Sequence, residues 1–325
     1  MTVHMTHASY EDASSARTPS VPSTRRTPAA RAASALASLR GLALGDALGA
    51  QFFVPDNLPH LADRSLPSGS WPWTDDTEMA CVLHAELTRR GTVDQDELAK
   101  SFAHRHDFDR GYGPSTNRML RLVRQGGDWR TLAAEPFDGQ GSWGNGAAMR
   151  VGPLGAWFAD DLDMVAEQAA LSAEVTHTHP EGVAGAVAVA VAAAGAVTLD
   201  RPGAGDFVSF VRDRTPIGLV RERLGAALDL VDRQDSRAVG RMLGNGREVS
   251  APDTVPFAVW SASRHLDDYP AAFWSTASAG GDVDTTCAIV GAIVGVRAEL
   301  PAEWTRHVEA LPTWWQDAVA NSPLN

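Results

Sequence analysis

Residues 182–199 read GVAGAVAVAVAAAGAVTL, which is the longest apolar stretch of the chain. Its 18 residues reach the lower limit for a helix that spans a bilayer, but alanine and glycine dominate it and leucine occurs once. Such small residues gain little from transfer into lipid, whereas they let neighbouring helices approach closely. The stretch therefore predicts a buried central helix of an all-α protein.

Helical patterning continues on both sides of this stretch. Apolar residues within 36–43 share one face of a helix, which we expect to end in the glycine-containing sequence GDALGAQ at 45–51. Residues 79–87 repeat the spacing, and Asp94 and Ser115 are expected helix caps. Further helices are predicted at 162–175, 181–198, 216–232, 253–265 and 284–299. The pattern predicts one all-α domain with long functional loops, of which 51–73 is the longest.

Residues 1–34 differ in composition from the rest of the chain. They are rich in Ser, Thr, Pro, Arg and Ala and contain few apolar side chains for a core. A segment that buries so little cannot offset the entropy lost on ordering. We therefore expect a disordered N-terminal tail at 1–34 and a helical domain at 35–325.

The overall composition excludes several classes of protein. The chain has 325 residues, 44% of them hydrophobic, which is enough for a sizeable core. It carries 40 acidic and 28 basic residues, and the net charge of −12 disfavours stable binding to nucleic acid. Two cysteines cannot form a disulfide framework, and no secretory h-region follows Met1. We expect a cytoplasmic protein that does not associate with membranes.

Two acidic clusters carry the chemistry. Residues 74–78 read TDDTE and residues 280–286 read GGDVDTT, and each cluster opens a predicted helix. Carboxylates and hydroxyls are common helix caps and complement the helix dipole, so a helix start explains either cluster alone. A cap needs only one oxygen acceptor, however, and both clusters supply several.

We expect the two clusters to meet in one pocket. Four carboxylates in one place repel one another, which raises their pKa values unless cations neutralise them. Two hard divalent cations would cancel the four charges, and a set of oxygen ligands favours Mg²⁺, Mn²⁺ or Ca²⁺ over zinc. The predicted ligands of this two-metal centre are Thr74, Asp75, Asp76, Asp282, Asp284 and Thr285.

The second acidic cluster also matches a different motif. Residues 282–286, DVDTT, fit the D-x-D-x-T nucleophile signature of haloacid-dehalogenase-like phosphatases. In those enzymes the first aspartate follows an apolar strand, whereas STASAGG precedes it here at 275–281. The chain also lacks a βαβ rhythm. We therefore interpret the cluster as part of the metal site.

Two further motifs lie between the acidic clusters. Residues 142–150 read SWGNGAAMR, and the glycines around Asn145 leave backbone N–H groups free to face an anion such as phosphate. Lysine is absent from this stretch, which argues against a Walker-type loop. Residues 176–180 read THTHP, in which His177 and His179 either contact a ligand or satisfy buried carbonyls. No third ligand lies at zinc spacing.

Four sequence blocks, taken in order, resemble the ADP-ribosylglycohydrolase family of the dinitrogenase-reductase-activating type. The blocks are GLALGDALG at 41–49, TDDTEM at 74–79, GNGAAMR at 144–150 with THTHP at 176–180, and GGDVDTT at 280–286. The resemblance implies one all-α domain of orthogonally packed helices with a binuclear Mg²⁺ or Mn²⁺ site. It also implies hydrolysis of the bond between C1″ of ADP-ribose and an acceptor, such as an arginine side chain.

The resemblance further implies roles for individual residues. The six predicted oxygen ligands would bind the two cations. The diphosphate and distal ribose would be lined by Gly144, Asn145, Gly146 and Met149, with His177 or His179 nearby. The substrate would be an ADP-ribosylated macromolecule or another ADP-ribose derivative.

The sequence departs from the family pattern at one position. Many relatives place a glutamate a few residues after GDALG, where this chain has Phe53. Asp107 and Asp109 are the nearest alternative acids, and we assign the catalytic role to Asp109, although a solvated loop explains both aspartates as well. Phe53 is then interpreted as an aromatic face that stacks on a base or a sugar ring.

Three hypotheses about function follow from these motifs. The first is a metal-dependent ADP-ribosyl-acceptor hydrolase. The second is a non-catalytic ADP-ribose-binding or toxin-neutralising protein, which the phenylalanine at position 53 suggests. The third is a two-metal phosphohydrolase that acts on a nucleotide. All three require Asp75 and Asp282 to lie close together.

Overall fold

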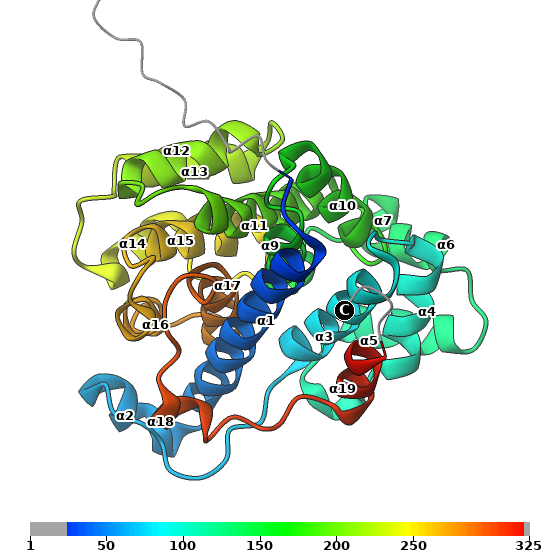
Figure 1. Ribbon diagram of the computed structural model, residues 1–325, viewed down its shortest axis with the longest axis horizontal. Coiled ribbons are helices and arrows are strands. Elements are labelled where there is room, and N and C mark those ends of the chain that lie inside the picture. Colours follow the sequence, from blue (N-terminus) through cyan, green and yellow to red (C-terminus); the bar gives the residue numbers. More distant parts are fainter. Residues whose placement is uncertain (1–24, 322–325) are drawn as a thin grey trace, which may run out of the picture.

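The computed structural model describes residues 25–321, which form helices joined by loops (Figure 1). Within this part of the chain there is no strand, and two isolated bridges join Trp71 to Val308 and Gly144 to Ser250. The all-α prediction is confirmed.

The helices follow one another in short succession along the chain. The first half contains α1 (Pro28–Ala50), the 3-10 turns η1 (Gln51–Phe53) and η2 (Pro55–Asn57), α2 (Leu58–Asp63), α3 (Asp75–Arg90), α4 (Gln95–Arg105), η3 (Phe108–Arg110), α5 (Pro114–Arg124), α6 (Trp129–Ala134), α7 (Pro136–Gly139), α8 (Gly146–Met149) and α9 (Gly152–Trp157). The second half contains α10 (Leu162–Glu174), α11 (Pro180–Thr198), α12 (Ala204–Arg214), α13 (Leu219–Leu228), α14 (Ser236–Leu243), α15 (Ala251–Ser263), α16 (Tyr269–Ala277), α17 (Val283–Val294), α18 (Ala302–Thr305) and α19 (Thr313–Ala320).

Helix α11 lies in the core, where it packs against α9, α10, α12 and α15. Small residues permit this close packing. A Cβ atom on Gly155 of α9, for example, would collide with the carbonyl of Ala190 in α11. By length and composition α11 is the one helix of the described residues that qualifies as a membrane span, but 78% of its apolar window is buried inside the protein. The prediction of a buried central helix is confirmed.

Helices α1 and α17 lie side by side, so segments more than 200 residues apart in the sequence are in contact (Figure 1). Gly41, Gly45 and Gly49 recur at every fourth position of α1 and face α17. A Cβ atom on Gly45 would collide with the Cys287 carbonyl oxygen, and one on Gly49 would lie 2.8 Å from the Cα atom of Asp284. Helix α1 ends at Ala50, within the expected segment 45–51. The glycines themselves do not break the helix: Gly45 and Gly49 are helical residues that allow backbone-to-backbone packing.

The start of α1 also differs from the expected boundary at residue 35. The helix begins at Pro28, capped by Thr27, and Arg31 forms an ion pair of 2.8 Å with Asp160. Composition alone does not reveal that long-range contact. Residues 28–34 thus belong to the helix and residues 25–27 lead into it, while residues 1–24 of the predicted tail lie outside the described residues.

Three smaller expectations also need correction. Ser115 does not cap α5, because Pro114 occupies the first helical position and Gly113 precedes it. The expected long loop 51–73 contains η1, η2 and α2. The helix expected at 216–232 is confined to α13, since Gly218 precedes it in an extended conformation.

Candidate metal centre and cleft

Asp46 of α1 fixes the position of the first acidic cluster. Its carboxylate accepts hydrogen bonds from the backbone N–H and hydroxyl of Thr74, at 3.0 and 2.8 Å, and from those of Thr77, at 3.1 and 2.5 Å. With both oxygens occupied, Asp46 orients the first turn of α3. The sequence analysis missed Asp46 as a site residue, although it lies within the quoted block 41–49.

The starts of α3 and α17 meet, as the interpretation of the acidic clusters required. The Thr285 hydroxyl of α17 donates to Asp76 Oδ2 of α3 over 3.4 Å, and the Thr74 hydroxyl approaches the same oxygen at 3.1 Å. Asp46, Asp76 and Asp284 each offer one carboxylate oxygen within 4.8 Å of the others. The close packing of α1 on α17 produces this convergence.

The electrostatics of the cluster call for a cation. Asp76 Oδ1 is buried and has no hydrogen-bond partner, which is costly for a carboxylate oxygen. Burial, followed by repulsion from neighbouring carboxylates, raises the pKa values of Asp76 and Asp284 well above the usual range and that of Asp75 to about 8. Only protons or cations can relieve this repulsion, and the oxygen-rich donor set fits Mg²⁺ or Mn²⁺.

A cleft with a volume of about 510 Å³ opens beside the cluster. Its lining combines residues of both acidic clusters with the 142–149 turn, His177, and the loops around 111–116 and 248–249. The predicted site residues that line it are Asp75, Gly144, Asn145, Gly146, Met149, His177, Asp282, Asp284 and Thr285. A cleft of this size accommodates a dinucleotide-sized ligand.

The glycines of the 142–150 motif make room for His177. A Cβ atom on Gly146 would lie 2.9 Å from Cε1 of the His177 ring, and one on Gly144 would lie 3.1 Å from its Nε2. The expectation of free backbone donors is not met at two positions, because the N–H of Gly144 donates to Ser142 Oγ and that of Asn145 donates to the Val249 carbonyl. Here glycine primarily lets an imidazole approach the backbone.

Asn145 connects the glycine turn to the second acidic cluster. Its side-chain amide donates to Asp282 Oδ2 at 2.7 Å and to the Thr254 hydroxyl at 3.1 Å, and the residue is 4% exposed. Burial raises the pKa of Asp282, whereas the amide hydrogen bond from Asn145 lowers it. Asn145 therefore holds one oxygen of Asp282 in a fixed direction.

A buried arginine sets the hydrogen-bonding state of His177. Arg150 Nη1 donates to the Thr176 hydroxyl at 3.0 Å, and that hydroxyl lies 2.7 Å from His177 Nδ1. Because the Thr176 oxygen accepts from Arg150, its own hydrogen is available to Nδ1, and we infer that the imidazole carries its proton on Nε2. Burial, followed by the Arg150 charge, lowers the pKa of His177 to about 3, so the ring is neutral at pH 7.

Five predicted site residues are not part of the cleft lining: Thr74 and Asp76, which belong to the acidic cluster beside the cleft, and Phe53, Asp109 and His179. Phe53 lies in η1 with 53% of its surface exposed, while the adjacent Phe52 is buried against Phe273 and Trp274. Asp109 is exposed in η3, and its backbone N–H donates to the Asp107 carboxylate. His179 caps α11, with its ring edge against Trp143. Phe53 and Asp109 are thus exposed residues outside the cleft lining, whereas His179 contacts the cleft through Trp143.

Several cleft residues escaped the sequence analysis. Glu248 and Val249 approach from the loop before α15, and Val249 has a φ of 50°, which is unusual for a β-branched residue and typical of strained functional loops. Gly111 reaches the acidic cluster from the loop before α5, where a Cβ atom would lie 3.8 Å from Asp75 Oδ1. No local pattern marks these loops, because tertiary packing alone brings them to the cleft.

The all-α fold and the acidic cleft are those of a helical glycohydrolase. The chain belongs to the ADP-ribosylglycohydrolase family, whose model matches residues 27–323. It is 30% identical to ADP-ribosylhydrolase ARH3 of Gallus gallus, over 84% of this chain and 88% of the relative. It is 32% identical to an uncharacterized protein of Archaeoglobus fulgidus, over 81% and 88% of the two chains. A solved structure titled ADP-ribosylglycohydrolase-related protein complex shares the fold, with a TM-score of 0.55, 24% identity and coverage of 90% and 96%.

Proposed function

We propose that this protein uses two divalent cations, Mg²⁺ or Mn²⁺, to hydrolyse the C1″ glycosidic bond between ADP-ribose and an acceptor. The observation that carries the proposal is the buried, unpartnered Asp76 Oδ1 at the junction of two acidic helix starts. Thr74, Asp75, Asp76, Asp282, Asp284 and Thr285 would hold the cations. When bound, such cations supply Lewis-acid chemistry at sugar hydroxyls and water.

The chain's own residues would bind and orient the substrate. His177 presents a neutral Nε2–H, which donates to a substrate oxygen without adding charge to the cleft. Asn145 keeps Asp282 aligned, and the glycine positions 144 and 146 leave room for the His177 ring beside the backbone. Cleavage at an anomeric carbon passes through an oxocarbenium-like state, so a fixed sugar and an accessible proton donor are both needed.

The proton donor is to be sought among the carboxyl groups that line the cleft. These are Asp75, Glu248, Asp282 and Asp284. Asp109, the acid proposed from the sequence, lies in exposed η3, so its participation would require the 107–113 loop to move toward the cleft. Replacing Asp75, Glu248 and Asp109 one at a time by the amide, and measuring turnover and ADP-ribose binding separately, assigns the acid.

The decisive experiment is an ADP-ribose release assay. The protein is incubated with ADP-ribosylated arginine, serine and nucleic-acid substrates, with Mg²⁺ or Mn²⁺ and with EDTA. We expect release of ADP-ribose from at least one substrate, loss of release in EDTA, and no release by the Asp284→Ala variant. The absence of cation-dependent release from all three substrates would contradict the proposal.

The position of Phe53 favours one alternative. Phe53 occupies the position of the usual glutamate and lies outside the cleft lining. The second candidate is therefore a protein that binds ADP-ribose without cleaving it, for example one that neutralises a toxin. Calorimetry distinguishes the two functions: tight binding of ADP-ribose together with undetectable turnover supports the binding protein. In either case, the two buried free cysteines are compatible with the proposed cytoplasmic location.

A further inference from the structure

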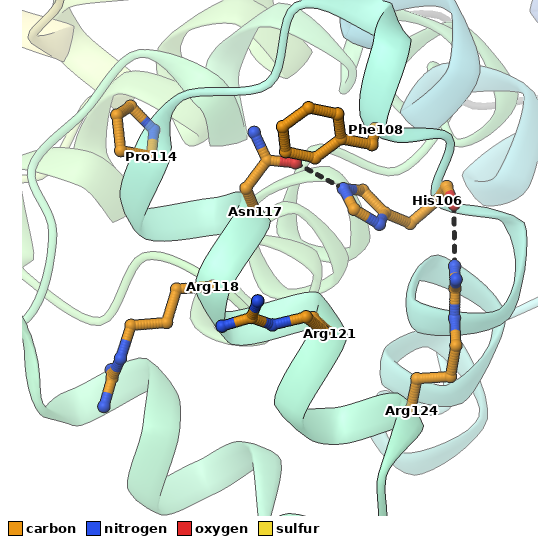
Figure 2. A pocket seen from close by; sticks show the side chains of 7 residues that line it. All are labelled: His106, Phe108, Pro114, Asn117, Arg118, Arg121 and Arg124. Atoms are coloured by element: carbon orange, nitrogen blue, oxygen red, sulfur yellow. Dashed lines mark hydrogen bonds between the residues drawn. The ribbon is translucent and has the colours of Figure 1, made fainter.

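A second pocket, of about 480 Å³, lies on α5 beside the cleft (Figure 2). Arg118, Arg121 and Arg124 recur at every third position and therefore share one face of the helix. His106, Phe108, Pro114 and Asn117 complete the lining, and none of the lining residues is acidic. The pocket is therefore lined by cationic groups in a protein whose net charge is −12.

The three guanidinium groups differ in how firmly other residues hold them. Arg124 is held by hydrogen bonds to the carbonyls of Ala103, at 2.6 Å, and His106, at 2.7 Å. Arg118 pairs with Glu135 across the surface at 3.0 Å, and exposed pairs of this kind contribute little stability. The Arg121 guanidinium has no hydrogen-bond or ion-pair partner within residues 25–321 and points toward Arg118 in Figure 2.

The walls of the pocket are held in place before any ligand binds. His106 Nε2 and Asn117 Oδ1 are 2.6 Å apart, and the Asn117 amide donates to the Tyr112 carbonyl at 2.7 Å. Phe108, which is 73% exposed, leaves an apolar face at the rim. A positioned set of arginines next to an exposed aromatic ring is suited to an anionic side chain flanked by an apolar one.

The pocket and the cleft share a wall. Pro114, the first residue of α5, lines both. The preceding Gly111 lies beside Asp75 of the proposed metal centre. A ligand in the pocket therefore lies on the side of the cleft that borders the acidic cluster. Under the proposed function, the acceptor is released from the C1″ bond on this side.

We infer that this pocket binds a phosphorylated or acidic side chain of the protein segment that carries ADP-ribose. The inference rests on the proposed function for the identity of that segment. A peptide is favoured over a polynucleotide because the arginines of this pocket lie on one face of a single helix in a protein with a net charge of −12, which suits a single anion and repels a polyanion.

The first test measures binding without turnover. A fluorescein-labelled peptide with one phosphoserine is titrated with the full-length protein, and its fluorescence anisotropy is followed. We expect Arg121→Glu to weaken binding about tenfold or more and Arg121→Gln to give an intermediate loss. The matched control is Arg40→Glu, which makes the same change of charge at an exposed position of α1 and should preserve the affinity. Saturating ADP-ribose should not displace the peptide.

Four results would overturn the inference. They are unchanged binding by Arg121→Glu, an equal loss in Arg40→Glu, displacement of the peptide by ADP-ribose, and tighter binding of a nucleotide monophosphate than of the phosphopeptide. The last two would assign the anion to the cleft and to a nucleotide site, respectively.

The second test links the pocket to the reaction. Hydrolysis is compared for ADP-ribosylated peptides with and without a neighbouring phosphoserine. We expect the phosphate to lower KM in the wild-type protein, and Arg121→Glu to remove that difference while kcat is unchanged. Peptide binding without turnover of any substrate would support the pocket and contradict the proposed function. Turnover with no effect of the phosphate would contradict the pocket alone.

Discussion

Asp76 has one carboxylate oxygen in hydrogen bonds and the other buried without a partner. Replacement by asparagine removes one charge from a crowded cluster and weakens a hard-cation ligand. We therefore expect Asp76→Asn to lose the rise in melting temperature that Mg²⁺ or Mn²⁺ gives the wild-type protein. A cation at 100 times its dissociation constant stabilises a protein by about 2.7 kcal/mol. Thermal unfolding with each cation and with EDTA measures the effect.

The control for this variant is Asp160→Asn. Asp160 is paired with Arg31 at the start of α1, away from the acidic cluster. Its replacement should lower the melting temperature and leave the cation-dependent rise intact. A full rise in Asp76→Asn would show that the cation binds elsewhere.

Thr176 controls which nitrogen of His177 carries the proton. Thr176→Val removes the hydroxyl between Arg150 and Nδ1, so both tautomers become accessible and Arg150 Nη1 loses this acceptor while keeping its hydrogen bond to the Gly146 carbonyl. We expect affinity for ADP-ribose to fall about tenfold and stability to fall by about 1–3 kcal/mol. The ¹⁵N shifts of the imidazole should change from those of the Nε2–H tautomer to averaged values.

Thr178→Val is the matched control, because the Thr178 hydroxyl donates to the Ala133 carbonyl rather than to the His177 ring. It should keep the imidazole shifts of the wild-type protein. A pure Nε2–H signal in Thr176→Val would contradict the role given to Thr176.

The pairing of α1 with α17 determines where the acidic clusters meet. A methyl group at Gly45 would collide with the Cys287 carbonyl, one turn after Asp284. Since backbone atoms cannot yield as a side-chain tip does, Gly45→Ala should destabilise the protein by about 1–3 kcal/mol or more. It should also weaken cation binding, because the two helix starts would be forced apart. Urea unfolding and cation titration measure the two effects.

Gly205→Ala provides the opposite case within a helix. A Cβ atom on Gly205 of α12 meets nothing within 4 Å, so alanine should be neutral or stabilising by about 0.5–1 kcal/mol. Equal effects of the two substitutions would mean that helix propensity, rather than the contact with α17, determines the cost at Gly45.

Sequence patterns predicted the helices better than their boundaries. The apolar stretch at 182–199 and the caps at Asp94 and in the acidic clusters were sufficient to locate α11, α4 and the starts of α3 and α17. The end of α1 at Ala50 falls within the predicted segment 45–51, whereas its start at Pro28 precedes the predicted residue 35. Glycine disfavours helices on average, but in α1 it allows a backbone contact that only the folded protein reveals. Local signals record propensity, and packing overrides it.

For the whole molecule, sequence reasoning identified most of the residue types of the site but not their arrangement. Residue chemistry predicted that the acidic clusters would converge, because each cluster supplies more oxygen ligands than a helix cap needs and together they could bind cations. Asp109 and Phe53 were assigned from proximity in the chain, yet they lie outside the cleft lining. Gly111, Glu248 and Val249 belong to the cleft through tertiary contacts alone. Loops carry too little local pattern to be placed without the fold.

The packing of the C-terminal helix α19 against α3 makes stability depend on pH. Trp315 of α19 donates to Nδ1 of His84 at 3.4 Å, and His84 Nε2 is buried without a partner. Burial lowers the pKa of His84 to about 4, from an ordinary value of 6.5. Between these values the unfolded chain binds more protons than the folded one, so the contribution of His84 to stability is lost as the pH falls from 6.5 toward 4.

Replacing His84 with methionine should remove this contribution to the pH dependence. Integrating the pKa difference predicts that His84 costs the wild-type protein about 2 kcal/mol between pH 7.5 and pH 5. The difference in unfolding free energy between His84→Met and wild type should therefore shift by that amount in favour of the variant as the pH falls. Taking the difference cancels the titration of His177 and of the cleft carboxyl groups, which both proteins share. His104→Met, at an exposed position of α4, should show no such shift, and a pH-independent difference for His84→Met would mean that His84 is not held neutral against Trp315.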